Sequence, residues 1–138
     1  MKIEQIHVGM SESHSSTIID PDIKAFADIS GDRNPVHLDE SYAEGSRYKK
    51  RIAHGLLSAS YFSAIFGTKL PGAGCVYVSQ NLSFRRPVYI DDTVTATVTV
   101  TKVDIEQRRI FFDTVCTVNK KKVITGVAEI YLPEVHSD

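Results

Sequence analysis

The sequence predicts an α+β domain in which a strongly curved antiparallel sheet wraps one long central helix. Residues 55–67 contain no charged residue, so a helix there must be buried on most of its sides. From residue 75 onward the chain is rich in strand-forming residues, and Val or Ala alternates with Thr over 93–101. Such a sheet must bury one face on the apolar helix, and curvature around a single helix satisfies both patterns.

The first helix is predicted over residues 20–30. Asp20 is a good N-cap, and Pro21 fits the first helical position. Apolar residues then recur at helical spacing, and Gly31 ends the helix. Residues 32–38 are expected to be a loop, because a run of Gly, Asn and Pro residues cannot be regular helix or strand.

Two short segments precede the central helix. Residues 39–44 are expected to form one or two helical turns, and residues 45–51 a polar, basic and exposed segment. The central helix begins near Gly55 and ends before the Pro and Gly residues of 70–74.

The rest of the chain is predicted to form four long antiparallel strands. In residues 93–101 every Thr falls on one face of the strand and every Val or Ala on the other, which is typical of a half-buried strand. The edges of such a sheet would stay unpaired, a liability that dimerisation can cover. The predicted strands are 75–84, 93–101, 110–118 and 123–132, with turns at 91–92 and 119–122.

Length and composition favour one ordinary globular domain over residues 1–138. The formal net charge of −1 would not gather nucleic acid or a membrane surface, so neither partner is expected. No secretory signal or membrane span is recognised, which favours the cytoplasm. Cys75 and Cys116 are predicted to be buried thiols, with a disulfide as the alternative. The His residues have no metal-ligand spacing, so no metal site is expected.

Three residues point to a reaction. Asp32 and His37 lie five positions apart, and a paired carboxylate and imidazole can hold and activate a water molecule. Gly55 marks a helix start, where developing negative charge on an oxygen is stabilised. These parts suffice to add water across a double bond conjugated to a carbonyl. The structural alternatives are a turn or cap role for Asp32, a backbone-bonded His37, and close helix–strand packing at Gly55.

Several motifs together resemble the signature of the (R)-specific enoyl-CoA hydratases, the MaoC-like or hydratase 2 group. The most specific is the Asp-x-Asn-Pro-x-His core at residues 32–37, followed downstream by Ala-His-Gly. The resemblance implies a hotdog fold that dimerises edge to edge, and fatty-acyl chemistry without a metal or redox cofactor. The matching segments are 26–39, 53–57, 82–84, 87–88 and 91–92.

The resemblance also implies roles for individual residues. Asp32 and His37 would be the catalytic pair, and Ser63 would support Asp32 from the central helix. The oxyanion donor would be a backbone N–H at or next to Gly55. Asn34 is expected near the substrate, where Asn34-Pro35 turns the chain so that both catalytic side chains meet.

The implied reaction is the reversible hydration of a trans-2-enoyl-CoA to the (R)-3-hydroxyacyl-CoA. Arg85, Arg86 and the basic run 47–51 are candidate contacts for CoA phosphates or for an acidic acyl-carrier protein, unless they form a solvated face. Phe66 shares a helix face with Ser63, so we expect it to limit the acyl pocket or else to pack in the core.

Three other functions compete with this one. A 3-hydroxyacyl-carrier-protein dehydratase would use the same Asp/His pair in reverse. A hotdog thioesterase usually carries an acidic residue on the central helix, and residues 56–66 have none. A non-catalytic acyl-binding protein would have no need of Asp32, Asn34, His37 and Gly55 together.

Overall fold

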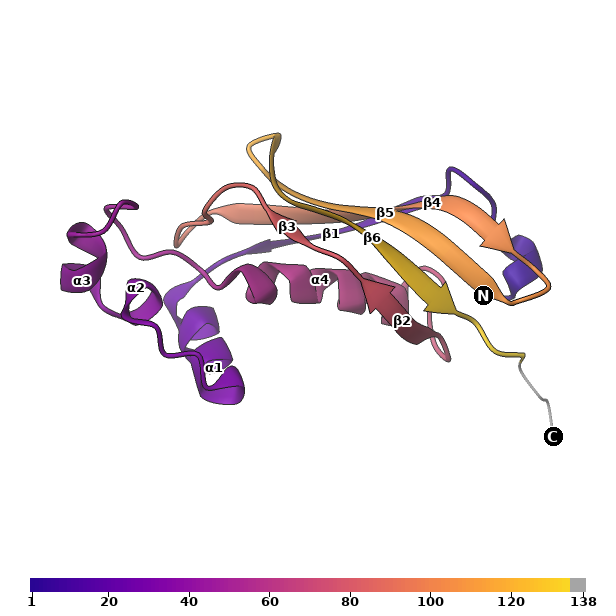
Figure 1. Cartoon of the computed structure of the whole chain (residues 1–138), viewed down its shortest axis with the longest axis horizontal. Helices are drawn as coiled ribbons and strands as arrows, with labels where there is room; N and C mark the ends of the chain where they lie inside the picture. The colour runs from indigo at the N-terminus through magenta and orange to yellow at the C-terminus, as the bar shows by residue number, and fades with distance from the viewer. Residues whose placement is uncertain (135–138) are drawn as a thin grey trace.

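The computed structural model describes residues 1–134 and has the predicted architecture (Figure 1). A curved antiparallel sheet lies along one side of helix α4, and the helices α1, α2 and α3 gather at one end of the molecule. The sheet order is β1-β4-β5-β6-β2, with β3 also paired to β6. The last four residues, including His136, lie outside the described part. The elements are η1 Ile3–Gln5, β1 Ser11–Thr17, α1 Asp20–Ser30, α2 Pro35–Leu38, α3 Glu40–Glu44, α4 Gly55–Thr68, β2 Val76–Gln80, β3 Ser83–Phe84, β4 Thr93–Asp104, β5 Arg109–Val118 and β6 Lys121–Tyr131.

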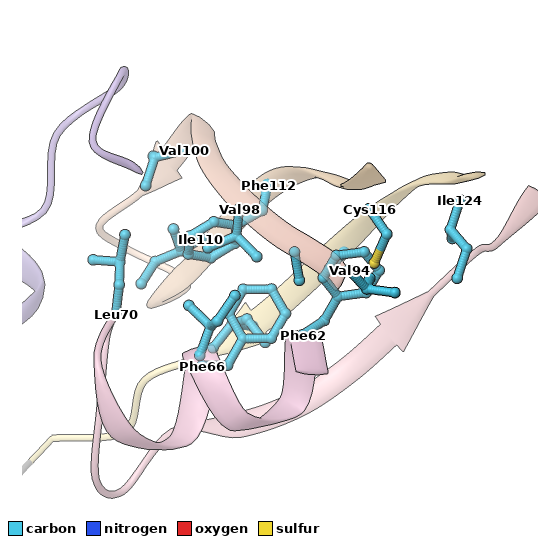
Figure 2. Packing of buried hydrophobic residues seen from close by; sticks show 14 of the residues in the cluster. Phe62, Phe66, Leu70, Val94, Val98, Val100, Ile110, Phe112, Cys116 and Ile124 are labelled. Atoms are coloured by element: carbon cyan, nitrogen blue, oxygen red, sulfur yellow. The ribbon is translucent and has the colours of Figure 1, made fainter. Parts of the chain in front are cut away.

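The core lies between α4 and the inner face of the sheet (Figure 2). Phe62 and Phe66 project from α4 toward Phe112 of β5, and Val94 and Val98 of β4 face the helix from the sheet. Alternate β4 residues are buried from Val94 to Val100, as the Thr/Val pattern predicts. Both cysteines are free thiols. Cys116 is buried, and burial raises its pKa to about 12, whereas Cys75 is only partly buried, so the prediction of two buried thiols is wrong at Cys75. Among the helices of residues 1–134, none is long and apolar enough to cross a membrane.

Strand β1 was not predicted. It pairs with β4 in antiparallel fashion along its whole length. Its sequence, Ser-Glu-Ser-His-Ser-Ser-Thr, has no apolar alternation, and most of the strand is exposed. Its stabilisation comes instead from cross-strand hydroxyl pairs on the outer face. These pairs are Ser11–Thr99 at 3.3 Å, Ser13–Thr97 at 2.9 Å, Ser15–Thr95 at 2.8 Å and Thr17–Thr93 at 2.8 Å.

Local details also differ from the predictions. Residues 35–38 form the helical turn α2 and not a loop, because the Asn34 side chain caps it by accepting from the backbone N–H of Val36 at 3.3 Å. The N-cap of α1 is Ile19, which frees the Asp20 carboxylate for other contacts. The predicted strand 75–84 divides into β2 and β3.

Candidate active site

Asp32 and His37 are brought together by the junction between α1 and α2. Gly31 ends α1 in the left-handed conformation at φ 82°, which turns the chain into Asp32. The Asp32 side chain accepts from the Asn34 N–H at 3.1 Å, and Asn34 in turn caps α2, which carries His37. The result is a distance of 4.0 Å between His37 Nε2 and Asp32 Oδ2. Asn34 therefore shapes this turn through its cap.

The hydrogen bond of the His37 ring fixes its tautomer. His37 Nδ1 lies 2.8 Å from the carbonyl oxygen of Ile52, and a carbonyl can only accept, so Nδ1 carries the proton. The lone pair therefore sits on Nε2, the atom that faces Asp32. A separation of 4.0 Å is too long for a direct hydrogen bond. Two acceptors at this spacing can each accept a hydrogen bond from the same water molecule.

The surroundings of His37 favour its neutral form. Burial lowers the pKa of His37, and the nearby His54 lowers it further, while the Ile52 bond and the Asp32 carboxylate act in the opposite direction. Because the pKa falls below its ordinary value, the imidazole is an unprotonated base at neutral pH. Asp32 is more exposed than His37: 52% of its side chain is accessible, so it can contact a reactant that enters from solvent.

Arg51 binds the backbone of His37, a contact that the sequence analysis did not predict. Its Nε donates to the His37 carbonyl oxygen at 2.7 Å, and an Nη atom lies 2.7 Å from the Asp20 carboxylate. Arg51 is buried, so the prediction of an exposed basic segment over 45–51 is wrong at this residue. Nothing in the basic run distinguishes Arg51 from its neighbours, so no local signal could have identified it.

Gly55 is the first residue of α4 and lines the same cavity, of about 210 Å³, as Asp32 and His37. The N–H groups of a first helical turn have no partner within the helix, so they can donate into the cavity. A Cβ atom at Gly55 would overlap the ring of Phe84 from β3. Close helix–strand packing therefore also requires glycine here, alongside its place at the cavity.

The structure separates Ser63 and Phe66 from this site. Ser63 is exposed and lines a groove between α4 and β2, two helical turns beyond Gly55. Phe66 is 1% exposed and packs on Phe112 and Tyr77, with ring centroids 4.8 and 5.1 Å away. Within one chain Ser63 is not placed against Asp32, and Phe66 belongs to the core, as its alternative interpretation has it.

Arg85 and Arg86 lie beside the site. Together with Arg47 they line a cavity of about 330 Å³ that also contains His37, Gly55 and Phe84. Phe84 is 54% exposed and borders both this cavity and the one that holds Asp32. The two cavities share His37, Gly55 and Phe84, so the cationic groups border a cavity that adjoins the Asp/His pair.

Asp32, His37 and His54 have side-chain ligand atoms within 4.8 Å of one another, a grouping that metal ions sometimes use. Their orientation does not suit a metal, however. The two rings stack at 3.8 Å between centroids and 27° between planes, so their in-plane lone pairs do not converge on one point. His37 Nδ1 and the Nε2 atom of His54 are also used by backbone carbonyls.

Comparison with known proteins agrees with this architecture. The family model described as "MaoC like domain" matches residues 4–127. An (R)-specific enoyl-CoA hydratase from Rhodospirillum rubrum is 51% identical over 130 residues, covering 94% of this chain and 90% of that protein. A 3-hydroxybutyryl-CoA dehydratase from Methylorubrum extorquens is 43% identical, covering 95% of this chain and 83% of that protein.

A solved structure extends the agreement to three dimensions. The (R)-hydratase from Aeromonas caviae superimposes with a TM-score of 0.92 at 36% identity, covering 94% of this chain and 99% of that one. The hotdog fold implied by the sequence motifs is thereby confirmed. With a family model that spans most of its length, this chain belongs to the MaoC-like domain family.

Proposed function

We propose that this protein, as a single domain over residues 1–138, catalyses the reversible (R)-specific hydration of trans-2-enoyl-CoA in the cytoplasm. The observation that carries the proposal is the unprotonated Nε2 of His37, which faces the Asp32 carboxylate across 4.0 Å beside the cavity that Gly55 also lines. The sequences and folds of the named hydratases support it. The hydration itself needs neither a metal nor a redox cofactor.

In the proposed mechanism a single water molecule donates one hydrogen bond to Asp32 and a second hydrogen bond to His37. The water oxygen bonds to the β-carbon as the pair takes one of its protons, and the π electrons move to form an enolate on the thioester oxygen. The N–H at Gly55 meets that oxygen at the positive end of α4. The pair then returns the proton to the α-carbon, so the elements of water add without any other reactant.

The magnitudes are sufficient for an enzyme of this class. General acid–base catalysis contributes about 10²–10⁴ in rate. One oxyanion donor contributes about 10²–10³. Both groups lie at the same cavity, so their contributions can apply to a single bound substrate.

Crotonyl-CoA tests the proposal directly. The purified protein is expected to hydrate it without added metal or nucleotide, and chiral analysis is expected to find the (R)-3-hydroxyacyl product. Activity that a chelator abolishes and a metal restores would contradict the mechanism. An (S) product would contradict the assigned stereochemistry.

The acyl carrier is proposed to be CoA, with a 3-hydroxyacyl-carrier-protein dehydratase as the second candidate. The cavity bordered by the cationic groups of Arg47, Arg85 and Arg86 favours a phosphate-bearing carrier. A thioesterase is disfavoured because α4 carries no carboxylate.

Replacing Arg85 and Arg86 by Ala is expected to raise KM for crotonyl-CoA about 10-fold and to leave kcat unchanged, because charged contacts to phosphate contribute about 1.5 kcal/mol or more. The control substrate is the crotonyl thioester of pantetheine, which lacks the CoA phosphates and should be unaffected. An equal rise in KM on both substrates would show that these arginines support the fold or the acyl site.

We further propose that the protein is a homodimer or higher homo-oligomer. Strand β2 ends the sheet, and its residues Val76, Tyr77 and Val78 are all exposed. An exposed apolar edge strand is a ready template for pairing with a second copy. Sedimentation at micromolar concentration is expected to give at least twice the monomer mass, and a monomeric mass would contradict the proposal.

A further inference from the structure

His54 contacts both members of the Asp/His pair. Its Nε2 lies 2.9 Å from the backbone carbonyl oxygen of Asp32, and its ring stacks on the His37 ring at 3.8 Å. The ring of Phe26, from α1, is also in contact, with centroids 4.8 Å apart. Only 3% of His54 is exposed, so this imidazole is enclosed by the groups that it touches.

The Asp32 contact determines the tautomer of His54. A carbonyl oxygen can only accept, so Nε2 carries the proton and the neutral ring has its lone pair on Nδ1. Nδ1 is buried and has no hydrogen-bond partner among the described residues. A buried lone pair without a donor costs free energy, and such an atom needs an explanation.

A matching donor is present one helical turn away. The Ser58 hydroxyl is fully buried and is likewise without a partner in the described part of the chain. Ser58 follows His54 by four residues, and helical side chains lean toward the N-terminus of their helix. Ser58 and His54 therefore lie one turn apart at the start of α4, and the Ser58 hydroxyl is a donor that rotation of its side chain can turn toward Nδ1.

We propose that His54 is a positioning residue for the hydration: its Nε2–H bond fixes the Asp32 backbone, its ring fixes the plane of His37, and the Ser58 hydroxyl donates to its Nδ1 after rotation of the Ser58 side chain toward that atom. This inference rests on the proposed roles of Asp32 and His37. His54 touches no reacting atom in this scheme. It sets the 4.0 Å gap into which the water must fit.

Two substitutions at His54 separate positioning from mere support of the fold. His54→Phe keeps a flat ring for stacking and removes the N–H, whereas His54→Gln restores an amide N–H near the position of Nε2. A misplacement of about 1 Å can cost about 100-fold in rate, so His54→Phe is expected to lower kcat about 30-fold with KM changed less than about threefold. His54→Gln is expected to stay within about fivefold of the parent kcat.

Ser58→Ala tests the second contact and is expected to lower kcat about fivefold, again with little change in KM. Ile65→Val, a buried substitution in the same helix, is the control for destabilisation: it should lower Tm and leave kcat unchanged. All variants are compared with Asp32→Asn, which reports on the proposed function alone.

Each outcome decides the proposal. A parental kcat in His54→Phe, or a loss that Gln does not restore and that follows Tm, would overturn the positioning role. A parental kcat in Ser58→Ala would overturn the Ser58 contact. If Asp32→Asn is also fully active, the proposed function itself fails. If Asp32→Asn is inactive while His54→Phe is active, only this inference fails.

Discussion

Asp32→Asn and His37→Gln are each expected to lower kcat on crotonyl-CoA at least about 100-fold, because each removes one of the two acceptors that hold and deprotonate the water. Each replacement is close in size to the original side chain, and Asp32 lies in a largely exposed turn. Asp32→Asn is therefore expected to change Tm little, whereas His37→Gln also removes the buried Nδ1–H bond to Ile52 and is expected to lower Tm. Steady-state kinetics with a thermal scan on the same samples checks both expectations.

The matched controls for these variants are Asp28→Asn and His14→Gln, which alter the same residue types away from the cavity. Both should keep parental kcat.

The acid side of the pH profile gives a second test, because the lowered pKa of His37 keeps the imidazole unprotonated at pH values below the usual pKa range of histidine. Activity should therefore fall only at pH values below that range. A variant of Asp32 or His37 with near-parental kcat would exclude that residue as acid or base.

Removal of the N–H at Gly55 is expected to lower kcat about 10²–10³-fold, the usual effect of losing one oxyanion donor. Proline is the appropriate replacement, since it lacks an N–H and is well tolerated at the first position of a helix. His54, which precedes it, already has the extended conformation, φ −62° and ψ 132°, that proline demands.

The ring of Phe84 would collide with any side chain at Gly55, so both arms of this experiment carry Phe84→Ala. In that background Gly55→Ala adds a Cβ and keeps the N–H, whereas Gly55→Pro adds the Cβ and removes it. The ratio of the two kcat values isolates the donor. Equal activity of the two variants would move the oxyanion contact to the next backbone N–H, that of Leu56.

Prediction from sequence succeeded where one pattern decided the structure. The uncharged run of α4 and the strict Thr/Val alternation of β4 each allow one buried arrangement, and both elements formed as expected. Strand β1 was missed because neither of its faces is apolar, so burial does not mark it in the sequence. The turn α2 was missed because a proline that breaks a helix interior can equally begin one.

In the site, too, contacts between residues close in sequence could be predicted, whereas contacts between residues far apart in sequence could not. Asp32 and His37 lie within one short segment, so their approach could be predicted from spacing. Arg51 reaches Asp20 across 31 residues, and His54 reaches the Asp32 carbonyl across 22. These contacts exist only after α1 and the residues that follow it have come together with the segment that leads into α4. Arg51 therefore looked like one member of a basic run, and neither spacing nor composition connected His54 with Asp32.

The hydroxyl pairs between β1 and β4 have a consequence for strand alignment. Ser or Thr recurs at every second position on both strands, so a slip of β1 by two residues would re-form most of the same pairs. The repeated hydroxyl pairs stabilise the pairing of the two strands but do not define a unique register. The register must therefore be set by contacts at the strand ends. There the buried Ile18 exchanges backbone bonds with Asp91 and Asp92 at 2.7 and 2.9 Å, and Val100 bonds to Gly9 and Met10 at 2.9 and 2.8 Å. The hydroxyl pairs thus hold β1 against β4, and the backbone hydrogen bonds at the two ends of β1 set its register.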